Sequence, residues 1–327
     1  MYGLALPLEV QIREVGPRDG FQNEPEIIAT DDKVRLIEML GRSGTCRLEV
    51  TGFVRPDVIP QLADAREVLE RIELPEEVCI SVLVPNERGL ESAFELRDRI
   101  DEVNVFLSAS ETHNRKNVNR SIQESLFELE RVLPRACDAN LHTEATISVA
   151  FGCPYEGDVP RERVFAIARK LVEAGAEEIG FGDTTGMANP RQVRSFFEAA
   201  RVELGDEIEL TAHFHNTRGQ GLANVLAALE AGVTSFESSF GELGGCPVYG
   251  PDPHPRTAAG NVATEDLVSL LHEMGIETSI DLDLLLEATR EVQRVLGRRL
   301  RSHTLVAGPV EWHRAAAAAG DGVQAAL

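Results

Sequence analysis

The sequence predicts a single (β/α)8 barrel, the TIM-barrel fold of the α/β class, with an additional helical segment at its carboxyl end. Short apolar runs rich in β-branched residues alternate eight times with longer segments of helical periodicity, which is typical of a closed parallel barrel. The length of 327 residues suits one such barrel, although two small domains would also fit. No Ser/Pro-rich linker divides the chain, so we expect one catalytic domain over residues 1–327.

The first half of each repeat is a strand, expected wherever a short apolar run stands between polar or turn-forming residues. These runs cover residues 10–15, 47–51, 78–84, 103–107, 145–150, 178–182, 209–214 and 235–239.

The second half of each repeat is a helix, expected where apolar residues recur at positions i, i+3 and i+4. These segments cover residues 32–43, 60–72, 87–98, 121–138, 160–174, 190–203, 219–231 and 264–274. Several end at a glycine, such as Gly44, Gly175 and Gly232, which can adopt positive φ and cap the last turn. A further amphipathic segment, 281–297, predicts an added helix packed on the barrel. The Ala-rich end, about 314–327, has few large apolar side chains and is expected to fray.

The charge balance excludes two classes of partner. A formal net charge of −22 repels nucleic acid and anionic membrane surfaces, which bind proteins mainly through basic side chains.

Neither a secretory signal nor an apolar stretch long enough to span a membrane is present. Five scattered cysteines suit reduced thiols better than a disulfide framework. These features predict a soluble cytoplasmic protein.

Polar residues gather where the expected strands end. In TIM barrels the loops after the strands converge around one mouth, which holds the active site. The residues at these ends are Arg18, Asp19, Glu49, Asp183, His213, His215 and Cys246. Such clustering would be improbable for residues that serve solubility alone.

The pattern His213-Phe214-His215 places two imidazoles on one side of a strand and Phe214 on the other. Two histidines that point into a barrel mouth can share a metal ion, although a His-x-His pattern alone is more often structural. Asp19 and Asn261 are available from neighbouring loops. Together these donors favour Mg²⁺ or Mn²⁺ over a zinc site built from thiolates.

A glycine-rich loop over residues 241–247 presents the thiol of Cys246. Glycines allow a loop to move and to approach a ligand closely, so such a loop could carry a proton donor over a bound substrate. For Cys46, Cys79 and Cys137 we expect the usual role of a buried structural cysteine.

Motifs along most of the chain resemble those of the 3-hydroxy-3-methylglutaryl-CoA lyase family, within the DRE-TIM metallolyase superfamily. The first is Val15-Gly16-Pro17-Arg18-Asp19-Gly20-Phe21-Gln22-Asn23-Glu24. The others are Phe53-Val54 with Pro60-Gln61, Lys116-Asn117-Val118-Asn119 with Ser121-Ile122, Gly152-Cys153-Pro154-Tyr155-Glu156-Gly157, Gly182-Asp183-Thr184, His213-Phe214-His215, Gly244-Gly245-Cys246-Pro247 and Gly260-Asn261-Val262-Ala263-Thr264-Glu265-Asp266. Related synthases and aldolases share the Arg-Asp pair and the two histidines but lack the Gly-Gly-Cys-Pro loop.

The resemblance implies a retro-Claisen cleavage of 3-hydroxy-3-methylglutaryl-CoA, or a close 3-hydroxyacyl-CoA relative, to acetyl-CoA and a keto acid. It also implies a homodimer and a role for each site residue. Asp19, His213, His215 and Asn261 would bind the divalent cation, Arg18 would stabilise the enolate, Cys246 would protonate it, Glu49 and Asp183 would orient these groups, and Gln22 and Thr184 would contact the substrate. Which group deprotonates the C3 hydroxyl is left open.

Four positions around the expected acyl pocket depart from the family pattern. Gly52 and Gly180 stand where the family usually has serine, Thr146 where it has tyrosine, and Glu144 where it has arginine. These changes remove hydroxyl groups and a positive charge, so we expect a wider pocket and a substrate with a larger C3 substituent or an altered distal acid group. Drift with compensation elsewhere is the alternative. His254, in a longer loop after Cys246, is expected to be a loop residue.

Three other functions stay open at this point. One is a lyase for a different 3-hydroxyacyl-CoA, with a longer C3 branch or a citramalyl-type skeleton. Another is a Claisen-type synthase or aldolase of the same superfamily, which the Gly-Gly-Cys-Pro loop disfavours. The third is a barrel without catalysis that serves as an interaction partner, which the full set of site residues argues against.

Overall fold

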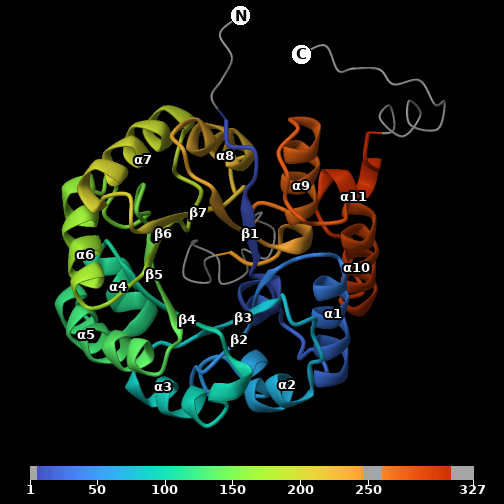
Figure 1. Cartoon of the computed structure of the whole chain (residues 1–327), viewed down its shortest axis with the longest axis horizontal. Coiled ribbons are helices and arrows are strands. Elements are labelled where there is room, and N and C mark those ends of the chain that lie inside the picture. The colour runs from blue at the N-terminus through green and yellow to red at the C-terminus, as the bar shows by residue number, and fades with distance from the viewer. Residues whose placement is uncertain (1–5, 246–259, 311–327) are drawn as a thin grey trace, which may run out of the picture.

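Eight parallel strands close into a barrel in sequence order in the computed structural model of the chain (Figure 1). The structure describes residues 6–245 and 260–310. Each strand pairs in parallel with the next along the chain, and β8 pairs with β1 to complete the ring. The predicted TIM-barrel class is confirmed.

Each strand overlaps the run that predicted it. The strands are Gln11–Glu14 (β1), Arg47–Gly52 (β2), Cys79–Leu83 (β3), Glu102–Ser108 (β4), His142–Ser148 (β5), Glu178–Asp183 (β6), Glu209–Phe214 (β7) and Ser235–Ser238 (β8).

Helices surround this barrel on its outer side (Figure 1). The α-helices are Thr30–Arg42 (α1), Ala65–Arg71 (α2), Glu87–Phe94 (α3), Glu111–Val118 (α4), Ile122–Asp138 (α5), Arg161–Glu173 (α6), Pro190–Leu204 (α7), Gly221–Glu230 (α8), Thr264–Glu273 (α9), Leu282–Val295 (α10) and His303–Ala307 (α11). Single helical turns are Gly16–Gly20 (η1), Phe21–Asn23 (η2), Pro60–Leu62 (η3), Arg97–Arg99 (η4) and Phe240–Glu242 (η5).

Two helices differ from the sequence-based expectation. The segment 60–72 is divided into η3 and α2, because Asp64 between them turns its carboxylate toward α1 and binds the Nζ atom of Lys33 at 2.8 Å. Helix α4 was not predicted, since Val118 is its only large apolar residue and no apolar stripe marks it. The Oγ atom of Ser110 begins that helix by accepting the backbone N–H of His113.

The carboxyl-terminal helices lie beside α1, at one side of the ring (Figure 1). Helix α10 matches the added helix that was expected over 281–297, and Arg35 of α1 pairs with Glu291 of α10. The tail over 314–327 lies outside the described residues. In the described part of the chain, every helix is too short or too polar to cross a membrane.

A layer of aromatic rings fills the space between β6, β7 and the helices outside them. Ring centroids in this layer lie 4.7 to 6.4 Å apart, as expected for tilted and edge-on aromatic pairs. Its members are Phe151, Phe165, Phe181, Phe196, Phe197 and Phe214. The layer fixes which face of β7 turns outward.

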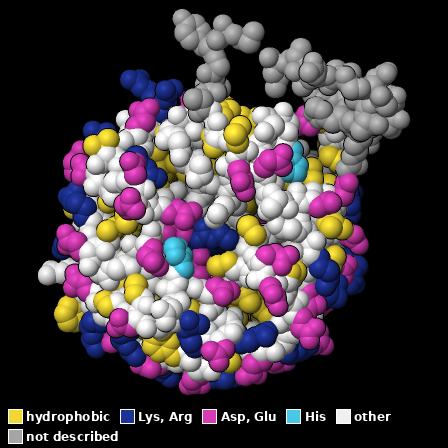
Figure 2. Space-filling view, viewed as in Figure 1, with side chains coloured by type: hydrophobic (Ala, Val, Ile, Leu, Met, Phe, Trp, Pro, Cys, Tyr) yellow, Lys and Arg dark blue, Asp and Glu magenta, His cyan; other side chains and the backbone are white. Residues whose placement is uncertain are grey.

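The inside of the barrel, by contrast, holds charged side chains. Arg13 of β1 is 1% exposed and forms ion pairs with carboxylates from four other strands. Arg47 of β2 pairs with Glu102 and Glu178 in the same interior. Basic, acidic and histidine side chains also gather near the centre of the face drawn in the space-filling view (Figure 2). A buried charge is tolerated only when it is paired, so the stability of the barrel interior depends on these ion pairs.

Candidate metal centre and active site

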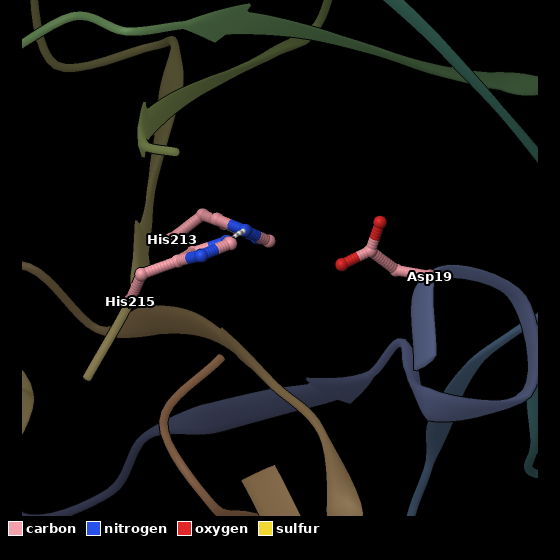
Figure 3. Close-up of side chains that lie close together, drawn as sticks. All are labelled: Asp19, His213 and His215. Carbon is pink, nitrogen blue, oxygen red and sulfur yellow. Dashed lines mark hydrogen bonds between the residues drawn. The ribbon is translucent and has the colours of Figure 1, made fainter. Parts of the chain in front are cut away.

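Strand β7 delivers two histidines to the barrel mouth. Phe214 packs outward against Phe151 and Phe197, with ring centroids 5.9 and 6.4 Å away. Because alternate residues of a strand face opposite sides, His213 and His215 turn toward the barrel interior. Their Nε2 atoms face each other at 3.0 Å (Figure 3).

Asp19 reaches the two histidines from the first loop of the barrel. It lies in η1, the single turn that follows β1. Its carboxylate points toward both imidazoles (Figure 3). One ligand atom from each of Asp19, His213 and His215 lies within 4.8 Å of the others, so the three side chains could share one metal ion.

Asn261 completes this donor set from the segment before α9. Its Nδ2 atom donates to Asp19 Oδ2 at 2.7 Å and to the backbone oxygen of Leu243 at 3.0 Å. Its Oδ1 atom is buried and accepts no hydrogen bond within the described residues. A buried amide oxygen without a donor is costly, and a cation would satisfy it. Two imidazoles, a carboxylate and an amide oxygen therefore fit a divalent metal.

The charge states of these groups suit a cation. Burial alone would raise the pKa of Asp19, but Arg18 and the two histidines hold it below its usual range. Burial lowers the pKa of His215 to about 3, so its imidazole is neutral and keeps a lone pair for coordination.

Arg18 lies beside the metal candidates and is fixed on two sides. Its Nε atom donates to Glu49 Oε2 at 2.5 Å, and its Nη1 atom donates to Asp19 Oδ1 at 2.8 Å. Gln22 donates to that same oxygen of Asp19 at 2.7 Å. The structure thus brings Arg18, Glu49 and Gln22 together with the metal candidates, as the sequence predicted.

Comparison with known proteins identifies the family. The family model described as HMGL-like matches residues 9–292. The chain is 48% identical over 299 residues to hydroxymethylglutaryl-CoA lyase YngG of Bacillus subtilis, covering 91% of this chain and 97% of that protein. It is 40% identical over 297 residues to the human mitochondrial hydroxymethylglutaryl-CoA lyase, covering 91% of this chain and 89% of that protein.

The chain belongs to the HMGL-like family. Solved structures agree. The crystal structure of the B. subtilis HMG-CoA lyase matches with a TM-score of 0.87 at 47% identity, over 92% of this chain and 98% of that chain. An HMG-CoA lyase from Acinetobacter baumannii, in complex with coenzyme A and 3-methylmalate, matches with a TM-score of 0.86 at 38% identity, over 92% of this chain and 95% of that chain.

The pocket around Gly180 differs from the expectation for this HMGL-like chain. A Cβ atom on Gly180 would lie 2.8 Å from Glu144 Oε1 and 3.0 Å from Thr146 Oγ1, and a Cβ on Gly52 would lie 3.0 Å from the Cβ of Leu83. Side chains of neighbouring strands already occupy the space that two serines would fill. These neighbouring side chains leave little room for a serine at either glycine, but the expected wider acyl pocket stays a prediction.

Glu144 itself has a different setting from the one expected. It is fully buried and pairs with Arg13 inside the barrel, away from solvent. The resemblance predicts an arginine at this position of the fifth strand. This chain has Glu144 there, and it faces Arg13 of the first strand. Arg13 therefore supplies a positive charge inside the barrel from β1.

Asp183 and Thr184 anchor the loops after β5 and β6. Asp183 accepts the backbone N–H groups of Met187 at 2.7 Å and Ala188 at 3.1 Å, and burial raises its pKa to about 7. Thr184 accepts the backbone N–H of Val149 at 3.0 Å. These two hydrogen bonds of Asp183 shape a loop beside the mouth, and its expected role in orienting Arg18 and the metal ligands stays a prediction.

Three residues of this site, Asn104, Glu237 and Arg13, escaped the sequence-based prediction. Asn104 donates to Glu49 Oε1 at 3.2 Å and accepts from Thr146 Oγ1 at 3.1 Å, which connects Thr146 to the support of Arg18. Glu237 lies 2.7 Å from His213 Nδ1 and also binds Arg13. Each is a polar or charged residue inside a strand, and that position was the only available signal.

Cys246, the expected proton donor, and His254 lie outside the described residues. The other four cysteines are free thiols. Cys46, Cys79 and Cys137 are half-buried rather than buried, and Cys153 is buried.

Proposed function

We propose that this protein is a carbon–carbon lyase that cleaves 3-hydroxy-3-methylglutaryl-CoA to acetyl-CoA and acetoacetate with the aid of Mg²⁺ or Mn²⁺. The observation that carries the proposal is the donor set of Asp19, His213, His215 and Asn261 beside Arg18, in a chain whose close relatives are hydroxymethylglutaryl-CoA lyases. The oxygen-rich and imidazole donors support a hard or borderline cation.

The cleavage begins with loss of a proton from the C3 hydroxyl of the substrate. A divalent cation bound at this site would polarise that hydroxyl and lower its pKa. The C3 oxygen then forms a carbonyl, the C2–C3 bond breaks, and its electron pair passes to the thioester as an enolate. Protonation of the enolate carbon gives acetyl-CoA, and the remaining fragment is acetoacetate.

Arg18 is the donor that would stabilise the enolate oxygen. Glu49 and Asp19 hold its guanidinium from two sides, so the positive charge is in place before charge develops on the substrate. Gln22, bound to the same carboxylate, would contact the acyl group. The thiol of Cys246 is our proposed proton donor, on the strength of the family motif.

A groove beside the mouth suits the coenzyme A portion of the substrate. Its volume is about 860 Å³, and it extends from Gly52 across the loops after β2 and β3. Four arginines line it together with three acidic residues: Arg55, Arg66, Arg88, Arg120, Asp57, Glu87 and Glu128. Guanidinium groups bind phosphates in bidentate geometry, which supports placement of the coenzyme phosphates there.

A homodimer and a cytoplasmic location are further parts of the proposal. The homodimer rests on family resemblance, and light scattering of the purified protein tests it. The relatives include a bacterial enzyme and mitochondrial ones, so the location needs fractionation of the source cells.

The activity is tested by mass spectrometry of the products formed from a panel of 3-hydroxyacyl-CoA thioesters. We expect acetyl-CoA and acetoacetate from 3-hydroxy-3-methylglutaryl-CoA, with the highest kcat/KM of the panel. A better rate with a longer C3 branch or a citramalyl-type compound would transfer the proposal to that substrate. Condensation without cleavage would refute the lyase.

A further inference from the structure

Glu237 of β8 makes a contact with one metal candidate that the mechanism above does not use. Residue 213 of β7 is paired with residue 237 of β8 in the barrel register, so both side chains face the interior at the same level. Glu237 Oε2 lies 2.7 Å from His213 Nδ1, and Glu237 is only 3% exposed.

The second oxygen of Glu237 is also held. Glu237 Oε1 accepts from Arg13 Nη1 at 2.9 Å. Arg13 in turn contacts Glu102 at 2.6 Å and Glu178 at 3.1 Å, and it also pairs with Glu144. With partners from β4, β5, β6 and β8, the guanidinium of Arg13 has little freedom to rotate, and neither does the carboxylate that it binds.

His215 lacks a comparable support. Its Nδ1 atom is buried and has no hydrogen-bond partner within the described residues. The two imidazoles therefore differ, because a carboxylate fixes the ring of His213 alone. A carboxylate at Nδ1 selects the tautomer whose Nε2 lone pair is free for a metal.

We propose that Glu237, held in place by Arg13, is a positioning residue that fixes the ring and tautomer of His213 for metal binding. This inference rests on the proposed function, in which His213 is a ligand. It also gives a role to the altered charges in the barrel. Arg13 on β1 pairs with Glu144, and it also pairs with Glu237. Glu144 stands at the position where an arginine was expected.

The test is Mn²⁺ affinity, measured by electron paramagnetic resonance of free Mn²⁺ over a titration. In the Glu237→Gln variant we expect the Kd to rise about 10- to 100-fold, the usual effect of losing a carboxylate behind a histidine ligand. The matched control is Glu102→Gln. Glu102 is equally buried and also binds Arg13, but among the described residues it forms no hydrogen bond or ion pair with His213, so the Kd of this variant should stay within about twofold of the wild type.

Two outcomes of the titration would overturn this inference and leave the proposed function standing. These are a wild-type Kd in Glu237→Gln, or an equal loss of affinity in both variants. If the wild-type protein bound no Mn²⁺, the proposed function would fail and this inference with it.

A second measurement needs no variant and covers the case in which Glu237→Gln does not fold. Nitrogen-15 NMR of histidine-labelled wild-type protein, loaded with Mg²⁺, should show His213 protonated at Nδ1 and unprotonated at Nε2. The opposite tautomer would overturn the inference.

Discussion

Asn104 connects two parts of the active site that come from different strands. It lies on β4 and is 1% exposed, and its amide joins Glu49 of β2 to Thr146 of β5. Glu49 holds the Nε atom of Arg18. The position of Arg18 therefore depends on Asn104, which acts on it through Glu49.

We expect Asn104→Leu to lower both stability and turnover. The change leaves Glu49 Oε1 and the Thr146 hydroxyl without their partner, which should cost about 1–3 kcal/mol in the free energy of unfolding. Loosening of Arg18 should lower kcat in the folded protein. Urea unfolding and steady-state kinetics measure the two effects. Thr143→Val, which removes a buried hydrogen bond at the other end of β5, should reduce stability and leave kcat unchanged.

At Gly180 the structure reverses a simple expectation, since restoring the family's serine should harm the protein. A Cβ there would approach Glu144 Oε1 to 2.8 Å, so we expect Gly180→Ser to destabilise by about 1–3 kcal/mol. The double variant with Glu144→Ala should show a smaller added cost, measured as a coupling free energy in urea unfolding. A Gly180→Ser variant with full stability and a higher kcat/KM would instead mean that the pocket is open.

At the scale of elements, two buried glutamates hold the segment from which the Cys246 loop departs. Glu14 accepts the N–H groups of Gly16 at 2.7 Å and Phe240 at 3.1 Å, and the hydroxyl of Thr264 at 2.5 Å. It thereby joins β1 to η5 and α9. Glu265 accepts the N–H of Gly241 at 3.1 Å in the same way.

This arrangement predicts a stability that falls as the pH rises. Burial raises the pKa of Glu14 from 4.5 to about 8, so the folded state retains a proton that the unfolded state has lost. The contribution is complete below pH 4.5 and is lost as the pH rises through about 8, with a slope of up to about 1.4 kcal/mol per pH unit. Glu14→Gln keeps the shape without the titration, so its free energy of unfolding should vary less over this range. An unchanged slope in urea unfolding would contradict the role assigned to Glu14.

Most strands were predictable because they contain apolar residues that the fold buries, as in Val103, Val105 and Leu107 of β4. Helix α4 was not, because Glu111–Val118 has almost no apolar residues and is formed through the cap at Ser110. The break within 60–72 was hidden for a related reason, since it depends on the contact of Asp64 with Lys33 in another helix.

At the scale of the whole molecule, some residues of the site were predictable from the sequence and others were not. Asp19, His213, His215 and Asn261 stood out because barrel topology brings strand ends together whatever the details of packing. Glu237, Arg13 and Asn104 act through contacts across the barrel, between strands far apart in sequence. Such pairings depend on the register of the closed sheet, which local periodicity does not contain. The crowding at Gly180 was hidden because its neighbours Glu144 and Thr146 come from β5.

The central claim is that the barrel mouth is a metal-dependent lyase site. The most direct test measures acetoacetate formed from 3-hydroxy-3-methylglutaryl-CoA while Mn²⁺ is added back to chelator-treated protein, with wild type and Asp19→Asn compared. We predict that wild-type turnover is absent after chelation and returns in proportion to bound metal. Asp19→Asn should stay folded and should remain inactive at the same Mn²⁺ concentrations. Full turnover in the chelated wild type, or in Asp19→Asn, would contradict the account.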